Sequence, residues 1–222
     1  MNEKSELINP QKAYFNGKFK EKLQKAPGVQ AEMERKPDCG EDSYQGCNRL
    51  AGRKALVTGG DSGIGRAAAI AFAREGADVA LNYFPSEEED AEEVKKLIEK
   101  AGQKAVLLPG DLNRREVCAE IVEKAVDGLG GLDVLALAAG RQTACADLAE
   151  LSDAQLLETF QVNVFSMFWT VKAALPHLPA GSSIITTSSI HAAIGFPSAF
   201  PVNEAQSRLF PSVSVIKQYV KR

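Results

Sequence analysis

Three glycines at fixed spacing are the residues of this sequence whose chemistry is easiest to infer. Gly59, Gly63 and Gly65 follow the apolar run of residues 55–57, and an alanine-rich stretch with helical character comes next. Glycine lets the backbone turn sharply and approach a ligand closely. The N–H groups at the N-terminus of a helix favour a diphosphate. The segment therefore predicts a buried strand, a phosphate-binding turn and a helix.

A glycine-rich turn that binds no ligand is the alternative interpretation. The spacing is Gly-x-x-x-Gly-x-Gly, not the commoner Gly-x-Gly-x-x-Gly of dinucleotide-binding turns. The glycines nevertheless stand between a predicted strand and a predicted helix, which is the context that nucleotide binding requires. We therefore favour the nucleotide-binding interpretation.

Composition bounds the remaining possibilities. The 222 residues suffice for one domain with a substantial core, and 45% hydrophobic with 25% charged residues is ordinary for a globular protein. A net charge of −3 gives no electrostatic case for a nucleic-acid or anionic-membrane partner. No apolar stretch is long enough to span a bilayer, and the first residues are not a secretory signal.

The cysteines and histidines do not indicate a metal site. Cysteines at positions 39, 47, 118 and 145 match no zinc spacing, so we expect reduced thiols in a cytoplasmic protein. His177 and His191 are far apart and have no carboxylate at ligand spacing. We expect no metal.

Alternating strand and helix patterns predict the architecture. Strands are expected at 55–57, 78–83, 104–108, 132–138 and 183–187, with helices between them. Ser86 with Glu89, and Ser152 with Gln155, fit helix-starting capping boxes, and Pro176 should end the last helix. The alternation predicts an α/β, doubly wound parallel (Rossmann) sheet over residues 49–198. Residues 1–48 read as an extended arm that packs on the domain or trails from it, and 199–222 as a divergent tail.

Ligands of such sheets lie at the carboxyl ends of the strands. Asp111 follows the third predicted strand and is placed to meet an adenine ring. Ala139 and Gly140 follow the fourth strand, where a backbone can approach closely, and Ser188 and Ser189 follow the fifth.

The end of the second strand bears on the choice of cofactor. A carboxylate there usually holds the ribose 2′-hydroxyl of NAD and rejects a 2′-phosphate. Here the strand ends in Asn82-Tyr83-Phe84, with no acid before Glu87. We therefore favour NADP(H) over NAD(H), with Arg66 or Lys54 as the candidate cation for the phosphate.

Residues 50–198 resemble the short-chain dehydrogenase/reductase family, in particular its glucose/ribitol-type dehydrogenases and general-stress aldehyde reductases. Five segments carry the resemblance: residues 37–41 (Pro-Asp-Cys-Gly-Glu), 59–63 (Gly-Gly-Asp-Ser-Gly), 87–90 (Glu-Glu-Glu-Asp), 107–111 (Leu-Leu-Pro-Gly-Asp) and 186–190 (Thr-Thr-Ser-Ser-Ile). Residues 138–142, Ala-Ala-Gly-Arg-Gln, also look like that subgroup, although the broader family has Asn-Ala-Gly there.

The resemblance implies an oxidoreductase that moves a hydride between a nicotinamide dinucleotide and an aldehyde, sugar or polyol. It implies that Ser189 hydrogen-bonds the substrate carbonyl and that Asn163 supports the catalytic helix and a proton-relay water. It further implies a homo-oligomer, whose interface we expect to be incomplete here. The residues expected at the cofactor are Thr58, Gly59, Asp61, Ser62, Gly63, Ile64, Gly65, Asn82, Tyr83, Asp111, Leu112, Ala139 and Gly140.

The catalytic Tyr-x-x-x-Lys pair that the resemblance implies is not at its expected place. Those two positions are Val202 and Gln206. Tyr14 and Lys18 share the spacing, but they precede the first strand, and we interpret that match as accidental. Residues 199–222 do not resemble the family, so we expect a truncated or altered C-terminal part that leaves the fifth strand as an exposed edge. The alternative is that residues 213–216 (Val-Ser-Val-Ile) pair with that edge or fold over it, although no pattern supports this.

Three functions stay open on these grounds. The first is a family oxidoreductase, the second a cofactor-binding protein without turnover, and the third an unstable product without a function. A Tyr and a Lys at positions 202 and 206 would favour the first.

Overall fold

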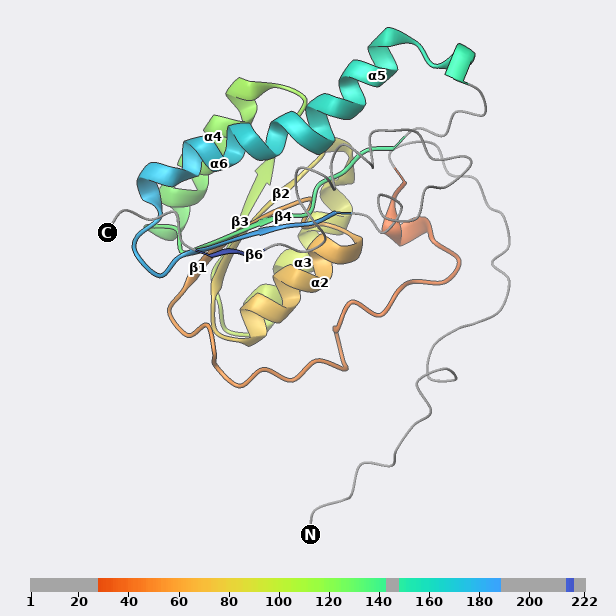
Figure 1. Cartoon of the computed structure of the whole chain (residues 1–222). Helices are drawn as coiled ribbons and strands as arrows, with labels where there is room; N and C mark the ends of the chain where they lie inside the picture. Colours follow the sequence, from red (N-terminus) through yellow and green to blue (C-terminus); the bar gives the residue numbers. More distant parts are fainter. Residues whose placement is uncertain (1–27, 143–147, 189–214, 218–222) are drawn as a thin grey trace.

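The computed structural model describes residues 28–142, 148–188 and 215–217 of the chain. Helices and strands alternate along these residues (Figure 1). The strands are β1 (Lys54–Thr58), β2 (Asp78–Tyr83), β3 (Ala105–Pro109), β4 (Val134–Leu137), β5 (Ser183–Thr186) and β6 (Val215–Lys217). The α-helices are α2 (Gly63–Arg74), α3 (Glu88–Lys100), α4 (Arg115–Leu129), α5 (Asp153–Phe160) and α6 (Ser166–Ala174). Short 3-10 turns are η1 (Gln30–Glu32), η2 (Pro85–Glu87), η3 (Leu148–Glu150) and η5 (Leu175–His177), and η4 (Gln161–Phe165) is a π-helical segment.

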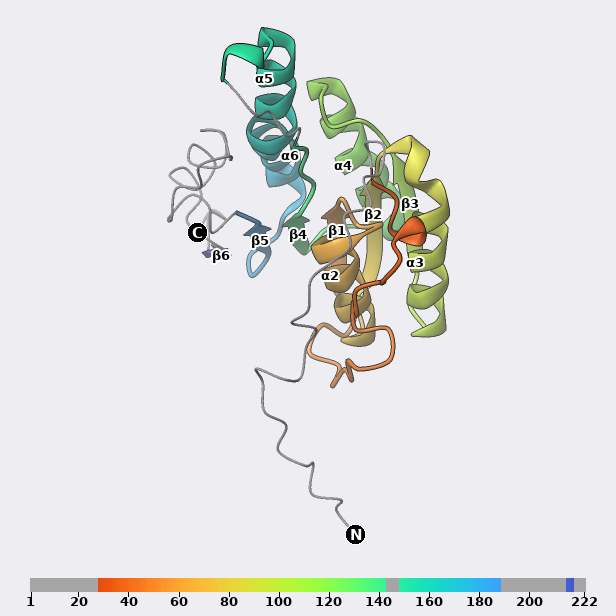
Figure 2. The ribbon, with the colours of Figure 1, turned by 90° about the vertical axis from the view of Figure 1, so that its right-hand side faces the viewer.

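The strands form one sheet in the order β3-β2-β1-β4-β5-β6, which Figure 2 shows along its edge. The first five are parallel, as the sequence predicts. β1 lies at the centre, and its last residue, Thr58, is in register with Asn82 of β2 and Leu137 of β4. The strand order reverses beside β1, so the carboxyl ends of β1, β2 and β4 surround the point where such sheets bind ligands.

Helices cover both faces of the sheet (Figures 1 and 2). α4 and α6 pack on one face around buried residues that include Leu56, Leu135 and Met167. α2 and α3 pack on the other around Val57, Leu81 and Ile98. Burial on both faces explains the continuous apolar runs of the strands and fixes the strand ends that carry the candidate site.

The expectation that β5 is an open edge strand is wrong. β6 pairs with β5 in antiparallel fashion, with Ile216 opposite Ile184. The pairing supplies backbone partners to the outer side of β5, which removes the exposed ladder that an edge strand presents.

Two helix starts behave differently from each other. Ser152 caps α5 as expected, since its side chain accepts the N–H of Gln155 and the Gln155 side chain returns to the Ser152 N–H. The expected cap at Ser86 is wrong: Ser86 lies inside the turn η2, and α3 starts at Glu88 without a side-chain cap. Pro85 at the start of that turn directs the chain into it, because its fixed φ suits a first helical position.

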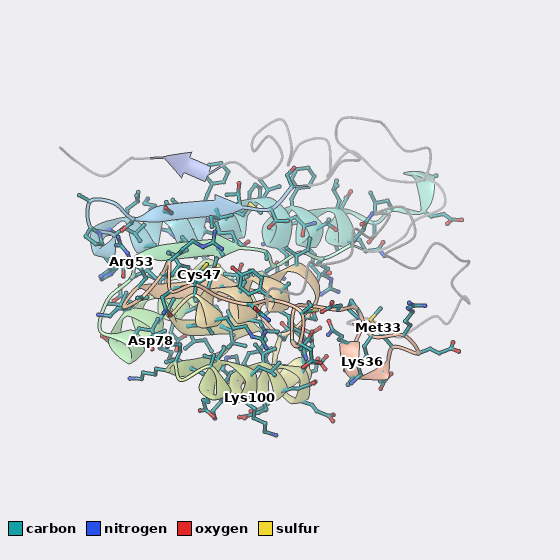
Figure 3. The ribbon with its side chains drawn as sticks, turned by 90° about the horizontal axis from the view of Figure 1, so that it is seen from below. Met33, Lys36, Cys47, Arg53, Asp78 and Lys100 are labelled. Carbon is teal, nitrogen blue, oxygen red and sulfur yellow. The ribbon has the colours of Figure 1, made fainter. Side chains whose placement is uncertain are left out.

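Residues 28–53 run along the α2 and α3 side of the domain from one end of the sheet to the other. Figure 3 places Met33 and Lys36 at the carboxyl end of the strands, and Cys47 and Arg53 at the opposite end. The buried carboxylate of Glu75, which ends α2, accepts hydrogen bonds from the Tyr44 hydroxyl, the N–H groups of Cys47 and Arg49, and the Arg49 guanidinium. This segment is therefore fastened to the end of α2 by specific polar contacts.

Within the described ranges no helix has the length and apolarity to cross a membrane. The same residues contain no group of His, Cys, Asp and Glu side chains that could hold a metal ion. Cys39, Cys47 and Cys118 are free thiols.

Candidate functional site

The glycine turn is packed so closely that its shape depends on glycine at two positions. A Cβ at Gly65 would lie 1.8 Å from the carbonyl oxygen of Gly59, and a Cβ at Gly59 would lie 2.8 Å from the Cα of Ala139. Both separations are far shorter than van der Waals contact permits. The turn therefore folds back on itself and against the end of β4, which is why the motif needs glycine at both positions.

Gly63 faces open space instead. A Cβ there would find no atom within 4 Å, and its φ of +52° is one that glycine adopts at little cost. Gly63 is also the first residue of α2, behind the extended N-cap Ser62. The first intrahelical bond runs from the Arg66 N–H to the Ser62 carbonyl, so the N–H groups of residues 63–65 precede it. The glycine turn is thus open at the N-terminus of α2, where helix N–H groups and the helix dipole favour a diphosphate.

Gln30, from the segment before β1, lies directly against this turn. Its Oε1 accepts the Gly63 N–H at 2.9 Å, and its own backbone N–H donates to Asp90 Oδ2 at 2.8 Å. The Ala31 N–H donates to the other oxygen of Asp90 at 3.1 Å. Gln30 is buried, so it joins the phosphate turn to the first turn of α3 away from solvent. Sequence reasoning missed Gln30, because nothing in its local pattern links it to a turn more than thirty residues away.

Thr58 joins the ends of β1 and β4. Its Oγ1 accepts the N–H groups of Ala138 and Ala139 at 3.2 and 3.3 Å. The side chain is buried, so it holds the backbone after β4 close to the glycine turn. Ala139 and Gly140 therefore lie beside the glycine turn.

Asn82 and Tyr83 lie at the expected strand end, but their side chains face inward. The Asn82 amide donates to the carbonyls of Leu108 and Gly110 at 3.1 and 3.0 Å, which links β2 to the end of β3. Its backbone carbonyl accepts the Gly60 N–H at 2.9 Å. Tyr83 is buried in the core under α3. Both residues thus shape the site, and neither side chain is offered to a ligand.

Two carboxylates gather beside the glycine turn and the end of β2. Asp61 belongs to the glycine turn and is 2% exposed, and its Oδ2 has no hydrogen-bond partner. Glu87 ends the turn that follows β2. Burial raises the pKa of Asp61, with a smaller contribution from Asp90. Burial, with the charge of Asp61 next in importance, raises the pKa of Glu87 to about 7.

The two cations expected to meet a 2′-phosphate are held elsewhere, so that expectation is wrong. The Arg66 side chain is 3% exposed and pairs with Glu41 at 2.8 Å and Glu93 at 3.1 Å. Lys54 begins β1 at the opposite end of the sheet, where its Nζ donates to the Gly130 carbonyl at 2.8 Å.

Asp111 and Leu112 follow β3 and have different surroundings. Asp111 is partly exposed at the carboxyl edge, where its Oδ1 accepts the Asn113 N–H at 2.9 Å and so shapes the loop. The Leu112 side chain is buried in the core beneath α4. Of these two residues, only Asp111 therefore presents its side chain at the carboxyl edge of the sheet.

Asn163 lies in the π-helical segment η4, between α5 and α6. Its Oδ1 accepts the Arg141 N–H at 2.7 Å, and its Nδ2 donates to the Arg141 carbonyl at 2.6 Å. The paired bonds dock the chain after Gly140 onto the helix, and a Cβ at Gly140 would lie 3.4 Å from the Asn163 oxygen. Asn163 therefore reaches the candidate site, through a contact with Arg141 that the sequence did not suggest.

Ser188, two residues beyond β5, carries a buried hydroxyl without a hydrogen-bond partner. Ser189, the expected substrate-binding hydroxyl, lies outside the described residues, as do Val202, Gln206, Tyr14 and Lys18. The described part of the candidate site is consequently the part around the glycine turn and the ends of β1 to β4.

Comparison with known proteins gives the same family throughout. The family described as short chain dehydrogenase matches residues 53–201. Uncharacterized oxidoreductase YhxD of Bacillus subtilis is 61% identical over 84% of this chain and 62% of the relative. General stress protein 39 of the same organism is 46% identical over 77% of this chain and 59% of the relative. NADPH-dependent aldehyde reductase 1, chloroplastic, of Arabidopsis thaliana is 38% identical over 78% of this chain and 62% of the relative.

Solved structures agree with these relatives. A short chain dehydrogenase from Burkholderia cenocepacia in complex with NADP is 35% identical, with a TM-score of 0.67 over 72% of this chain and 64% of that one. Carveol dehydrogenase from Mycobacterium avium in complex with NAD is 28% identical, with a TM-score of 0.66 over 72% of this chain and 63% of that one. The chain thus spans less than two thirds of the length of each of these five proteins.

Proposed function

Because this chain belongs to the short-chain dehydrogenase family, we propose that the carboxyl edge of its sheet binds a nicotinamide dinucleotide, with the diphosphate on the glycine turn. The observation that carries the proposal is the shape of that turn. Gly65 lies against the Gly59 carbonyl where no side chain fits, while Gly63 opens toward free space at the N-terminus of α2. A compact turn with an open, N–H-lined face suits a diphosphate.

The surroundings of the turn suit the rest of a dinucleotide. Ile64 is 67% exposed and Phe84 is 36% exposed, and both stand at the carboxyl edge, where apolar rings of a nucleotide would cover them. Asp111 borders the proposed adenine end. Ala139 and Gly140 border the path of the cofactor toward Asn163, where small side chains permit a close backbone approach.

The reaction we propose for the site is hydride transfer to or from an aldehyde, sugar or polyol. A relative that is 38% identical is named an NADPH-dependent aldehyde reductase, which supports a carbonyl or alcohol substrate. A bound nicotinamide would supply or accept the hydride. The chain's own contributions would be a hydrogen bond from Ser189 to the substrate oxygen and the positioning of the helix around Asn163.

Cofactor binding without turnover is the second candidate, and we favour it for the chain as it stands. When the carbonyl carbon accepts the hydride, the electron pair of the C=O π bond passes to the oxygen, which needs a proton as the alcohol forms. A positioned acid contributes about 10²–10⁴-fold to such a step. Val202 has no proton to give, and Gln206 carries no charge that could tune an acid. Asn163, whose amide is engaged by Arg141, does not replace that donor.

Self-association is a further part of the proposal. Leu157, Phe165, Phe168 and Leu175 are large apolar side chains on or beside α5 and α6, and each is 39–54% exposed. The ring of Phe165 also contacts that of Trp169, tilted by 54° with the ring centroids 5.9 Å apart. We propose that this row meets a second copy of the chain. Size-exclusion chromatography with light scattering would test this proposal. The Phe168→Ser variant should contain more monomer than the wild type does. A wild type that is monomeric at high concentration would contradict self-association.

Turnover assays separate the two candidate functions. NADH and NADPH oxidation would be followed with a panel of aldehydes and sugars, for the chain and for a chimera that carries a complete family C-terminal part after Ser198. Activity in the chimera alone, abolished by Ser189→Ala, is the expected result. Turnover by the chain itself that Ser189→Ala abolishes would contradict the binding-only proposal. A chain without a cooperative melting transition would instead support an unstable product.

A further inference from the structure

We infer that the adenosine end of this site selects NAD(H) over NADP(H), with Asp61 and Glu87 as the selecting residues. The inference rests on the proposed dinucleotide binding and adds which of the two cofactors is bound. This inference replaces the preference for NADP(H) that the sequence of the β2 end suggested. Asp61 and Glu87 are far apart in the sequence and come close to the end of β2 only in the folded chain.

The sheet register places both residues at the ribose. In a doubly wound sheet the adenosine ribose lies between the glycine turn and the end of the second strand. Here the Gly60 N–H donates to the Asn82 carbonyl at 2.9 Å, which holds the residue before Asp61 against the end of strand β2. Glu87 returns to the same strand end, because its N–H donates to the Phe84 carbonyl at 2.8 Å.

The Asp61 carboxylate has one oxygen that the protein leaves unused. Its own backbone N–H and the Ser62 hydroxyl serve the group, whereas Oδ2 is buried without a partner. A buried acceptor without a partner is costly, and a ribose hydroxyl is a donor that can satisfy it. A 2′-phosphate offers further negative charge and acceptors to the same place, so it would be repelled where solvent screens the charge least.

Glu87 adds to the same field from the other side of the ribose. The charges that act on its carboxyl group are those of Asp61 in the glycine turn and Asp90 in the first turn of α3. The two cations that the sequence suggested for a 2′-phosphate do not offset them. Arg66 is buried in pairs with Glu41 and Glu93, and Lys54 lies at the other end of β1. A ribose diol can donate to carboxylates, whereas a phosphate cannot.

The test is the dissociation constant of NADH and of NADPH, measured by nucleotide fluorescence on the whole chain at pH 8. The wild type should bind NADH about tenfold or more tightly than NADPH, since like charges that face each other oppose binding. Glu87→Gln and Asp61→Asn should each raise the affinity for NADPH at least about threefold. The affinity of each variant for NADH should stay within about twofold of the wild-type value or be lower. Glu99→Gln, at the far end of α3, is the matched control and should change neither constant.

The possible outcomes distinguish a failure of this inference from a failure of the proposed dinucleotide binding. Equal affinities in the wild type, or ratios unmoved in Glu87→Gln, would overturn the inference while the proposed function stands. Tighter NADPH binding that Lys36→Met abolishes would also overturn it, because Lys36 lies at the same end of the sheet in Figure 3. Binding of neither cofactor by a cooperatively folded chain would overturn the proposed function and this inference together. Glu87 is only partly buried, so its variant keeps the test decisive if Asp61→Asn fails to fold.

Discussion

The side-chain oxygen of Gln30 accepts the backbone N–H of Gly63 at 2.9 Å, although the two residues are 33 positions apart. Gly63 opens the helix whose N-terminus faces the proposed diphosphate. The bond fixes the first residue of the helix and leaves the N–H groups of Ile64 and Gly65 as the next donors of its first turn. The segment before β1 is thereby part of the construction of the cofactor site.

Gln30→Ala should weaken cofactor binding more than it weakens the fold. The variant removes the acceptor of the Gly63 N–H, a hydrogen bond that contributes about 0.5–1.5 kcal/mol, and frees the turn to move. We expect the dissociation constant for NADH to rise about three- to tenfold while the melting transition stays cooperative. Gln103→Ala, in the turn before β3, is the control for loss of a glutamine elsewhere. An unchanged dissociation constant would show that Gln30 is only structural.

Gly63→Ala and Gly52→Ala form a matched pair. Both glycines have positive φ, +52° and +73°, and a Cβ would meet no atom within 4 Å at either. Each variant should therefore lose about 1–2 kcal/mol of stability through the left-handed backbone. Only Gly63→Ala should weaken cofactor binding, because its Cβ enters the open face of the turn, whereas Gly52 precedes β1 at the opposite end. Calorimetric titration of both variants would reveal the contrast, and equal loss of affinity in both would refute it.

Glu75 predicts an acid-sensitive attachment of the segment before β1. The Arg49 guanidinium, and then the Tyr44 hydroxyl and two backbone N–H groups, hold the pKa of this carboxyl well below its usual range. Its stabilising contribution is therefore present above about pH 4.5 and is lost as the pH falls below that value. Glu75→Gln should melt at a lower temperature than the wild type at pH 7, and the gap should narrow toward pH 3.5. A gap that is constant with pH would contradict the assignment.

Glu87 predicts the opposite dependence. Its pKa is raised to about 7, so the folded state is penalised as the pH rises from about 4.5 through that value. Glu87→Gln should equal the wild type in urea stability at pH 4 and exceed it at pH 8. The gain should be about 1–2 kcal/mol, because solvent screens a partly buried group. A variant less stable than the wild type at pH 8 would show that the carboxylate is compensated by contacts at that site.

Sequence reasoning was most successful where a pattern is local. The β2 strand has the predicted bounds, 78–83, since its apolar run lies between Gly76 and Pro85. The Ser152 capping box also formed, because its two partners are three residues apart. The Ser86 cap failed although its spacing is the same, since Pro85 draws the chain into a 3-10 turn first.

The candidate site needed the fold. Asn82 was expected to face the cofactor, but its amide donates to the carbonyls of Leu108 and Gly110, at and just beyond the end of β3. Strand propensity alone cannot show that β3 lies beside β2. From the sequence, Arg66 was a candidate cation for a phosphate. In the fold it forms ion pairs with Glu41 and Glu93, which belong to two other segments of the chain. Gln30 accepts a hydrogen bond from Gly63, which is distant in the sequence, and Asp61 has a buried carboxylate oxygen. Residue spacing encodes neither feature.

The measurement that tests the central claim most directly is an amide-resolved NMR titration of the chain with NADH. The account predicts that the N–H signals of Gly63, Ile64 and Gly65 move with the dissociation constant of the cofactor, together with those of Ala139 and Gly140. The signals of Gly52, Lys54 and Gly130, at the opposite end of the sheet, should stay in place. Absent shifts at millimolar NADH, or shifts confined to that opposite end, would contradict a dinucleotide site on the glycine turn.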